Sequence, residues 1–145
     1  GGPPIWSAAS VSAGITRTAR HHDGWFPIGP NADTFATQNA QFRAEASAAG
    51  RNLEALTTAI YLTVSIMDDS VDAEAAIDAY LENYYNAPAA AMRTFQACKG
   101  GTEDQVISFI RSFVLGGAQH LVIRCVGDHD KILQVLSQRR DEFLG

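Results

Sequence analysis

The segment from Leu56 to Ile66 constrains the fold more than any other part of the chain. It reads LTTAIYLTVSI, is rich in β-branched residues and is bounded by polar residues. Its apolar character is nearly continuous, which is typical of a strand that is buried on both faces. Such strands occur in parallel sheets that are flanked by helices. The segment therefore predicts a parallel α/β protein.

Helix and strand signals alternate along the rest of the chain. Apolar strands are predicted at Ile5–Trp6, Trp25–Phe26 and His120–Cys125, in addition to the central one. Caps and apolar residues at helical spacing predict the helices. The first predicted helix covers roughly 13–22 with a cap at Ser10 or Ser12, and the second runs from Asn31 or Asp33 to Gly50. A third helix starts at Asp68-Asp69-Ser70, and a further helix starts at Pro88 after a break. The next runs from the capping box of Thr102 and Gln105 to Gly116-Gly117, and the last starts at Asp128 or Asp130.

Four strands that alternate with helices predict a parallel sheet with right-handed crossovers. Such a sheet is either open and doubly wound or an arc of an eight-stranded barrel. The 145 residues fit one domain of ordinary size.

Composition excludes several classes of partner. The chain has 11 basic and 16 acidic residues, a net charge of −5 and no cluster of Lys or Arg, so we expect no nucleic-acid partner. The longest apolar runs, such as 59–67, are shorter than the roughly 20 residues that cross a bilayer. The two cysteines, Cys98 in a helical region and Cys125 in an apolar strand, do not indicate a disulfide framework. We therefore expect a soluble cytoplasmic protein without a membrane segment.

The turn after the first strand is a candidate phosphate site. In parallel α/β architectures, ligands bind at the carboxyl ends of the strands. The turn Ala8-Ala9-Ser10-Val11-Ser12 places backbone N–H groups and hydroxyls at a helix N-terminus, which favours a phosphate. An ordinary helix cap without a ligand is the alternative. Ile28 and Gly29, at the end of the second strand, add a further backbone N–H, although a plain Gly/Pro loop explains them equally well.

Arg124 ends the last strand on the same side of the predicted sheet. Its guanidinium suits a phosphate or an acidic substrate group. The alternative is an ion pair with Asp68, Asp128 or Asp130, and the residues alone leave both open.

Other candidates have simpler structural explanations. His21-His22-Asp23 is interpreted as a cationic helix end, and the acidic residues near His129 lack the spacing of a metal site, so no metal is expected. Cys125 is predicted to be an inert core thiol, and the tyrosines of the third helix, Tyr80, Tyr84 and Tyr85, are predicted to pack rather than to stack on a cofactor.

Several short motifs, taken in order, resemble a known family. The motifs are PPIW at 3–6, AR at 19–20, DGWFP at 23–27, AGR at 49–51, GGTED at 100–104 and GAQHLVIR at 117–124. Together they resemble the C-terminal half of the bacterial luciferase-like monooxygenase superfamily, whose barrel enzymes use FMN or the related deazaflavin cofactor. The resemblance spans essentially all 145 residues.

The resemblance implies a fold and a function. The expected fold is the four-stranded parallel half of a TIM-type (β/α) barrel, completed by a partner or by an N-terminal half that carries the first four strands. The expected function is that of a C-terminal fragment of a flavin- or deazaflavin-dependent oxidoreductase or monooxygenase, inactive alone, whose parent enzyme acts on a small-molecule substrate. The turn at residues 8–12 corresponds to the turn that cradles the cofactor phosphate in the family. Many relatives carry Gly-Gly near this turn, whereas this chain has Ala8-Ala9-Ser10, as some deazaflavin-using members roughly do.

The alternative is a non-catalytic half-barrel module that forms a homodimer. Four parallel strands leave two unpaired edges, which need cover. Two copies related by a two-fold axis would pair these edges and complete an eight-stranded barrel.

Overall fold

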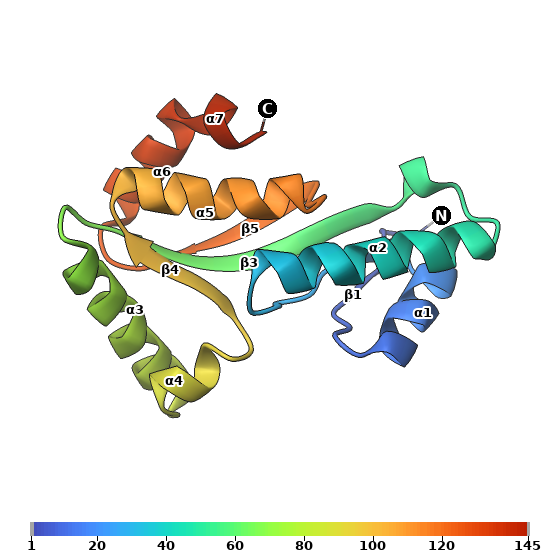
Figure 1. Ribbon diagram of the computed structural model, residues 1–145, viewed down its shortest axis with the longest axis horizontal. Coiled ribbons are helices and arrows are strands. Elements are labelled where there is room, and N and C mark those ends of the chain that lie inside the picture. The colour runs from blue at the N-terminus through green and yellow to red at the C-terminus, as the bar shows by residue number, and fades with distance from the viewer. Residues whose placement is uncertain (1, 145) are drawn as a thin grey trace.

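Five strands form one parallel sheet in the computed structural model, which describes residues 2–144 (Figure 1). The long strand β3 (Thr57–Ile66) is central and runs along most of the molecule. Its four companions are β1 (Trp6–Ser7), β2 (Gly24–Trp25), β4 (Ala97–Gly101) and β5 (His120–Cys125). The predicted parallel α/β fold is confirmed.

Strand β3 pairs with three neighbours because it is long. β4 and β5 both pair with its residues 62–64, so they lie on opposite edges. β2 pairs with Thr57 and Thr58, on the same edge of β3 as β4. On this edge Thr57 N donates to Asp23 O, and Met67 N donates to Gly101 O. On the opposite edge Gln119 N, just before β5, donates to Thr58 O. β1 pairs with the other edge of β2. The strands β1, β2, β3 and β5 therefore lie side by side in sequence order, as neighbouring strands of a barrel do.

Helices connect the strands at nearly the predicted positions. The longer ones are α1 (Ser12–His21), α2 (Ala32–Ala48), α3 (Ser70–Tyr85), α5 (Glu103–Leu115) and α6 (His129–Gln138); the shorter ones are α4 (Ala89–Met92), α7 (Arg140–Leu144) and the 3₁₀ turn η1 (Leu53–Ala55). Asn31, Asp69 and Asp128 cap α2, α3 and α6, and Thr102 with Gln105 forms the predicted capping box of α5. Gly50 and Gly117 adopt positive φ after α2 and α5, where L side chains are disfavoured.

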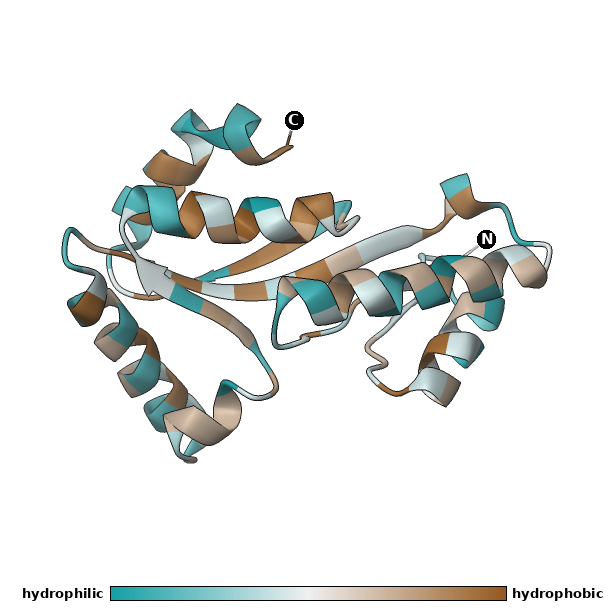
Figure 2. Cartoon of the chain, viewed as in Figure 1, coloured by the Kyte–Doolittle hydropathy of each residue, from teal (hydrophilic) through white to brown (hydrophobic). Residues whose placement is uncertain are grey.

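One face of the sheet, here called the outer face, carries the main hydrophobic core. Ile60, Leu62, Val64 and Ile66 alternate along β3 and are buried among residues of α1, α2, α5 and α6. At the β2 end, the ring of Trp25 stacks on Phe35 at 5.3 Å and on Phe42 at 5.9 Å between centroids. In Figure 2 hydrophobic residues recur along β3 and along α5, which lies against it.

The opposite face, here called the inner face, is covered only in part. Helices α3 and α4 pack over its β4 end with a small cluster of Ile77, Leu81, Ala89 and Val126. The approach is so close that a Cβ on Gly100 of β4 would lie 2.4 Å from backbone atoms of α3. The remainder, around Tyr61, Val122 and Arg124, is partly or fully exposed.

Four details of the predictions are wrong. β4 is a fifth strand that the sequence pattern did not indicate, and Cys98 therefore lies in a strand rather than in a helical region. The last helix is interrupted at Arg139, which separates α6 from α7. Tyr84 was placed on the packed face of α3, but it is 62% exposed. Finally, Val11 rather than Ser10 or Ser12 is the N-cap of α1.

Within residues 2–144, no helix is both long and apolar enough to cross a membrane.

Candidate functional site

The turn between β1 and α1 has its backbone N–H groups free of protein acceptors. Val11 is the N-cap of α1, and no side chain caps the helix. The N–H groups of Ser12, Ala13 and Gly14 therefore have neither an intrahelical acceptor nor a capping side chain. The turn closes tightly on the helix because residue 14 is glycine: a Cβ there would lie 3.1 Å from Ala9 Cβ.

The carbonyl groups of the same turn are engaged by other side chains. Trp25 Nε1 donates to Ala9 O at 2.7 Å, and Gln38 Nε2 donates to Ser10 O at 2.9 Å. Gln41 Nε2 donates to the hydroxyl of Ser12, the first residue of α1, at 2.7 Å. Side chains of β2 and α2 thus hold the turn through its oxygens and leave its N–H groups available.

Helix α1 differs from the other long helices of the described chain at this end. Helices α2, α3, α5 and α6 each have a side-chain cap or capping box and at least one acidic residue in the first turn. α1 has neither. Its partial positive charge is therefore not neutralised by the chain itself, and an anion there would be stabilised.

The loop after β2 lies beside this turn. β1 and β2 pair in parallel, and Phe26 N donates to Ser7 O at 3.0 Å, so the carboxyl ends of the two strands are neighbours. In the loop, the carbonyl of Ile28 accepts a hydrogen bond from Ala97 N at 3.2 Å, and a Cβ on Gly29 would meet no atom within 4 Å. The structure therefore brings residues 8–12 and 28–29 to adjacent strand ends, with space at Gly29.

Arg124 lies elsewhere, on the inner face of β5. Its Nε donates to Tyr61 Oη at 3.2 Å, and its Cζ is 6.0 Å from the centre of the Tyr80 ring. None of the described carboxylates forms the predicted alternative ion pair with it: Asp68 pairs with Lys131 Nζ at 3.0 Å, and Asp128 caps α6. Arg124 is thus separated from the phosphate turn by β2 and β3.

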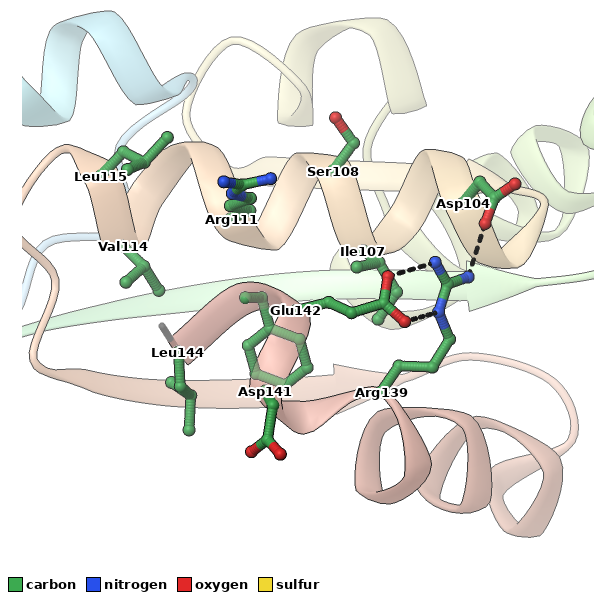
Figure 3. Close-up of a pocket in the computed structure, with 11 residues that line it drawn as sticks. Asp104, Ile107, Ser108, Arg111, Val114, Leu115, Arg139, Asp141, Glu142 and Leu144 are labelled. Atoms are coloured by element: carbon green, nitrogen blue, oxygen red, sulfur yellow. Dashed lines mark hydrogen bonds and ion pairs between the residues drawn. The ribbon is translucent and has the colours of Figure 1, made fainter.

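One cavity lies on the helical side of the molecule, away from the strand ends. It has a volume of about 560 Å³ and lies between α5 and α7 (Figure 3). Arg139 lies at one end of it, where it donates to Asp104 and to Glu142, and both hydrogen bonds raise the pKa of its guanidinium. The position of this cavity on the helical side gives it no relation to the predicted ligand residues.

The remaining candidates do not assemble into a site. Among the residues that the structure describes, no three His, Cys, Asp or Glu side chains could share a metal ion. Burial raises the pKa of both Cys98 and Cys125, so neither thiol is activated. His21 lies in the last turn of α1, as expected for a cationic helix end.

Sequence reasoning missed two features of the site. Gln38 and Gln41, which hold the turn, lie about 30 residues away from it and carry no motif. The one available signal was that Gln38 and Gln41 are three residues apart, which places both on one face of the second predicted helix. The contact between Arg124 and the tyrosines of β3 and α3 also had no local signal.

One family model and several solved structures are similar to this chain. A family model described as luciferase-like monooxygenase matches residues 1–141. Among solved structures, an F420-dependent secondary alcohol dehydrogenase in complex with an F420-acetone adduct is 13% identical, with a TM-score of 0.77. The coenzyme F420-dependent tetrahydromethanopterin reductase of Methanopyrus kandleri is 17% identical, with a TM-score of 0.68, and a riboflavin lyase with modified FMN is 16% identical, with a TM-score of 0.68.

The chain spans about half the length of these structures. The matches cover 95%, 97% and 99% of this chain and 48%, 51% and 44% of the dehydrogenase, the reductase and the lyase. No curated protein matches the sequence.

Proposed function

Because the chain belongs to the luciferase-like monooxygenase family, we propose that it forms the part of a flavin- or deazaflavin-dependent oxidoreductase that holds the cofactor phosphate. The observation that carries the proposal is the uncapped N-terminus of α1, whose free N–H groups point out of a turn that is held through its carbonyls. The turn Ala8-Ala9-Ser10-Val11-Ser12 is the cradle, and Ile28 and Gly29 add the second loop.

The residues present fit a phosphate group. A doubly charged phosphate needs several N–H donors and no competing carboxylate, and the first turn of α1 contains no acidic residue. The hydroxyl of Ser10 is exposed and is free to donate as well. When bound, the cofactor ring supplies the hydride or oxygen chemistry, while the protein positions the ring.

Either FMN or the deazaflavin F420 satisfies this proposal. The named relatives include proteins described with F420 and one described with modified FMN. Both cofactors carry a phosphate on the side chain of the ring, so the turn alone does not select between them. Two free cysteines are compatible with the reducing cytoplasm as the compartment of the enzyme.

Arg124 is the residue that we assign to the substrate. It extends from the carboxyl end of β5 on the inner face, where a barrel encloses its ligand. Its single described side-chain hydrogen bond uses Nε, which leaves both terminal NH₂ groups available. An acidic group of a small-molecule substrate is the natural acceptor.

The test of the cradle compares two ligands that differ only by the phosphate. The 145-residue chain is titrated with FMN and with riboflavin, and binding is followed by quenching of flavin fluorescence. We expect FMN to bind about tenfold more tightly, which corresponds to roughly 1.4 kcal/mol. In Ser10→Asp this preference should disappear, because the new carboxylate lies in the turn before the helix and repels the phosphate.

The matched control is Ser108→Asp on the exposed side of α5, which adds the same charge away from the turn. It should keep the preference for FMN. Circular dichroism shows whether both variants are folded. Equal affinity of the unsubstituted chain for FMN and riboflavin, or no binding of either, would contradict the phosphate cradle.

A second candidate function, self-association, is favoured by the open edge of β5. In residues 2–144, β5 pairs only with β3, and a groove of about 410 Å³ lies between β5, α6 and α7. Two copies would cover this edge by completing a barrel. Sedimentation equilibrium distinguishes the cases: a dimer that Val122→Pro converts to monomer supports this candidate, and a monomeric chain contradicts it.

A further inference from the structure

Three tyrosines and one arginine form a cluster on the inner face that the phosphate turn does not use. Tyr61 and Arg124 come from the neighbouring strands β3 and β5, and Tyr80 and Tyr84 come from α3. The guanidinium lies 6.0 Å from the centre of the Tyr80 ring, in the range of a cation–π contact, and donates to Tyr61 Oη. Three elements thus fix the position of one cation.

This cation has no anionic partner among the described residues. Its Nε makes one side-chain hydrogen bond, and the N–H groups of the two terminal nitrogens have no protein acceptor within residues 2–144. The net charge of the chain is −5, so an arginine without a carboxylate partner is not explained by a shortage of acidic residues. The carboxylates of Glu74 and Asp78 on α3 are instead paired with Arg93.

Tyr80 supplies a second unused group at the same place. Its hydroxyl is buried and has no hydrogen-bond partner, which is costly for a polar group. Burial raises the pKa of this phenol, so the hydroxyl stays protonated and remains a donor. A ligand oxygen within hydrogen-bond distance of this hydroxyl would recover the lost hydrogen bond.

Tyr84 offers a flat surface beside this pair. Its ring stacks on Tyr80 with centroids 5.5 Å apart and an interplanar angle of 24°, and Tyr85 contacts it edge-on at 4.8 Å. The ring is therefore held in place, yet the residue is 62% exposed. A fixed and exposed aromatic ring is suited to stacking with another ring.

A cavity of about 240 Å³ adjoins the cluster at Tyr61 and Arg124, and its other lining residues are Val122, Ile123, Cys125 and His129. The lining contains no acidic side chain, and Tyr80 and Tyr84 lie outside it. The cavity is smaller than the roughly 300–1,000 Å³ of pockets for drug-sized ligands. We propose that Arg124, Tyr61, Tyr80 and Tyr84 form a subsite for a single-ring aromatic carboxylate, whose carboxylate binds Arg124 and whose ring stacks against Tyr84. This proposal rests on the proposed function, because it assigns a substrate class to the proposed enzyme.

The experiment uses the 145-residue chain without cofactor and three small probes, followed by NMR chemical shifts. Benzoate has the charge and the ring, cyclohexanecarboxylate has the charge alone, and benzyl alcohol has the ring alone. We expect benzoate to bind about fivefold more tightly than cyclohexanecarboxylate, from stacking, and benzyl alcohol to bind at least about tenfold more weakly than benzoate, from loss of the charged hydrogen bonds.

Two variants separate the contributions, and one variant is the control. Arg124→Gln should weaken benzoate binding by about tenfold. Tyr84→Ala should remove the fivefold preference for the aromatic acid while retaining binding of the cyclohexane acid. Arg111→Gln replaces an exposed arginine beside the α5–α7 cavity and should change nothing.

Equal binding of the two acids, or a loss in Arg111→Gln that matches the loss in Arg124→Gln, would overturn this subsite. The result is independent of the phosphate cradle, because no cofactor is present. Benzoate binding without a preference for FMN over riboflavin would contradict the proposed function alone, and the reverse pattern would contradict the subsite alone.

Discussion

The two faces of strand β3 differ in what their side chains do. On the outer face, Ile60, Leu62 and Val64 are fully buried beneath helices and belong to the main hydrophobic core. On the inner face, Thr63 and Ser65 are also buried, but their hydroxyls have no hydrogen-bond partner. Alternate residues of the same ten-residue strand therefore have different roles: one set stabilises the fold, and the other set presents polar groups that have no hydrogen-bond partner.

The difference follows from how each face is covered. Side chains of four helices interdigitate with the outer face, which gives the dense packing of a hydrophobic core. The inner face meets the backbone of α3 at Gly100 and is otherwise partly open. In a TIM barrel the ligand binds at the carboxyl ends of the strands, and Thr63 and Ser65 lie near that end of β3, so their unpaired hydroxyls are consistent with a binding role.

The largest effect is expected from a cavity on the outer face. Leu62→Ala should lower the free energy of unfolding by about 3–4 kcal/mol, because the lost contacts leave a void at the centre of the sheet. Urea denaturation measures this change. Leu115→Ala on α5 makes the same substitution at a residue that is 77% exposed and should cost less than about 0.5 kcal/mol. Similar losses for the two variants would remove the basis of the comparison.

An intermediate effect is expected where α3 approaches the inner face. Gly100→Ala should destabilise the chain by about 1–3 kcal/mol, because the added Cβ would lie 2.4 Å from backbone atoms of Ala73 and Glu74, which cannot move as a flexible side chain does. The control is Gly29→Ala, where the added Cβ meets nothing within 4 Å. Thermal unfolding that is unchanged in Gly100→Ala would show that α3 does not pack on this face as described.

The smallest effect concerns the ion pairs that fasten α3 to β4 and α4. Partial burial raises the pKa of Glu74, but hydrogen bonds from Lys99 and Arg93 lower it more, so the pKa in the folded chain is below the ordinary value. The pair therefore stabilises the fold above the unfolded pKa of a glutamate, and this stabilisation is lost as pH falls through the lower folded pKa.

Glu74→Gln should accordingly reduce stability at neutral pH by no more than about 1 kcal/mol, since the pairs are partly exposed. The difference between the variant and the unsubstituted chain should vanish in strongly acidic buffer. Denaturant titrations between neutral pH and pH 3 measure it, and a difference that is constant over that range would exclude the ion pairs as its source.

Local signals accounted for most of the elements. Asn31, Asp69 and Asp128 cap their helices as predicted, because a capping side chain bonds to backbone within three residues of itself. Strand β4 was not predictable in this way. Its sequence ACKGG contains two glycines and a lysine, which do not favour a strand, and it forms one because the edge of β3 beyond β2 is free to pair.

The phosphate turn was predictable in part. A small-residue segment between a strand and a helix marks its place, and the adjacency of residues 8–12 and 28–29 follows from the parallel order of β1 and β2. The predicted cap was wrong, since Val11 is the N-cap and Ser12 lies inside the helix, where its Oγ accepts a hydrogen bond from Gln41. That contact crosses from α1 to α2 and depends on how the two helices pack.

The sequence by itself determined the alternation of strands and helices, the helix caps and the polar or small residues at the strand ends, because each depends on neighbours within a few positions. Only the tertiary structure decided which edge of β3 each strand occupies, which face remains open, and that Arg124 meets Tyr61 and Tyr80 instead of a carboxylate. These contacts join segments far apart in the chain, and their free energy exists only once the sheet has brought those segments together.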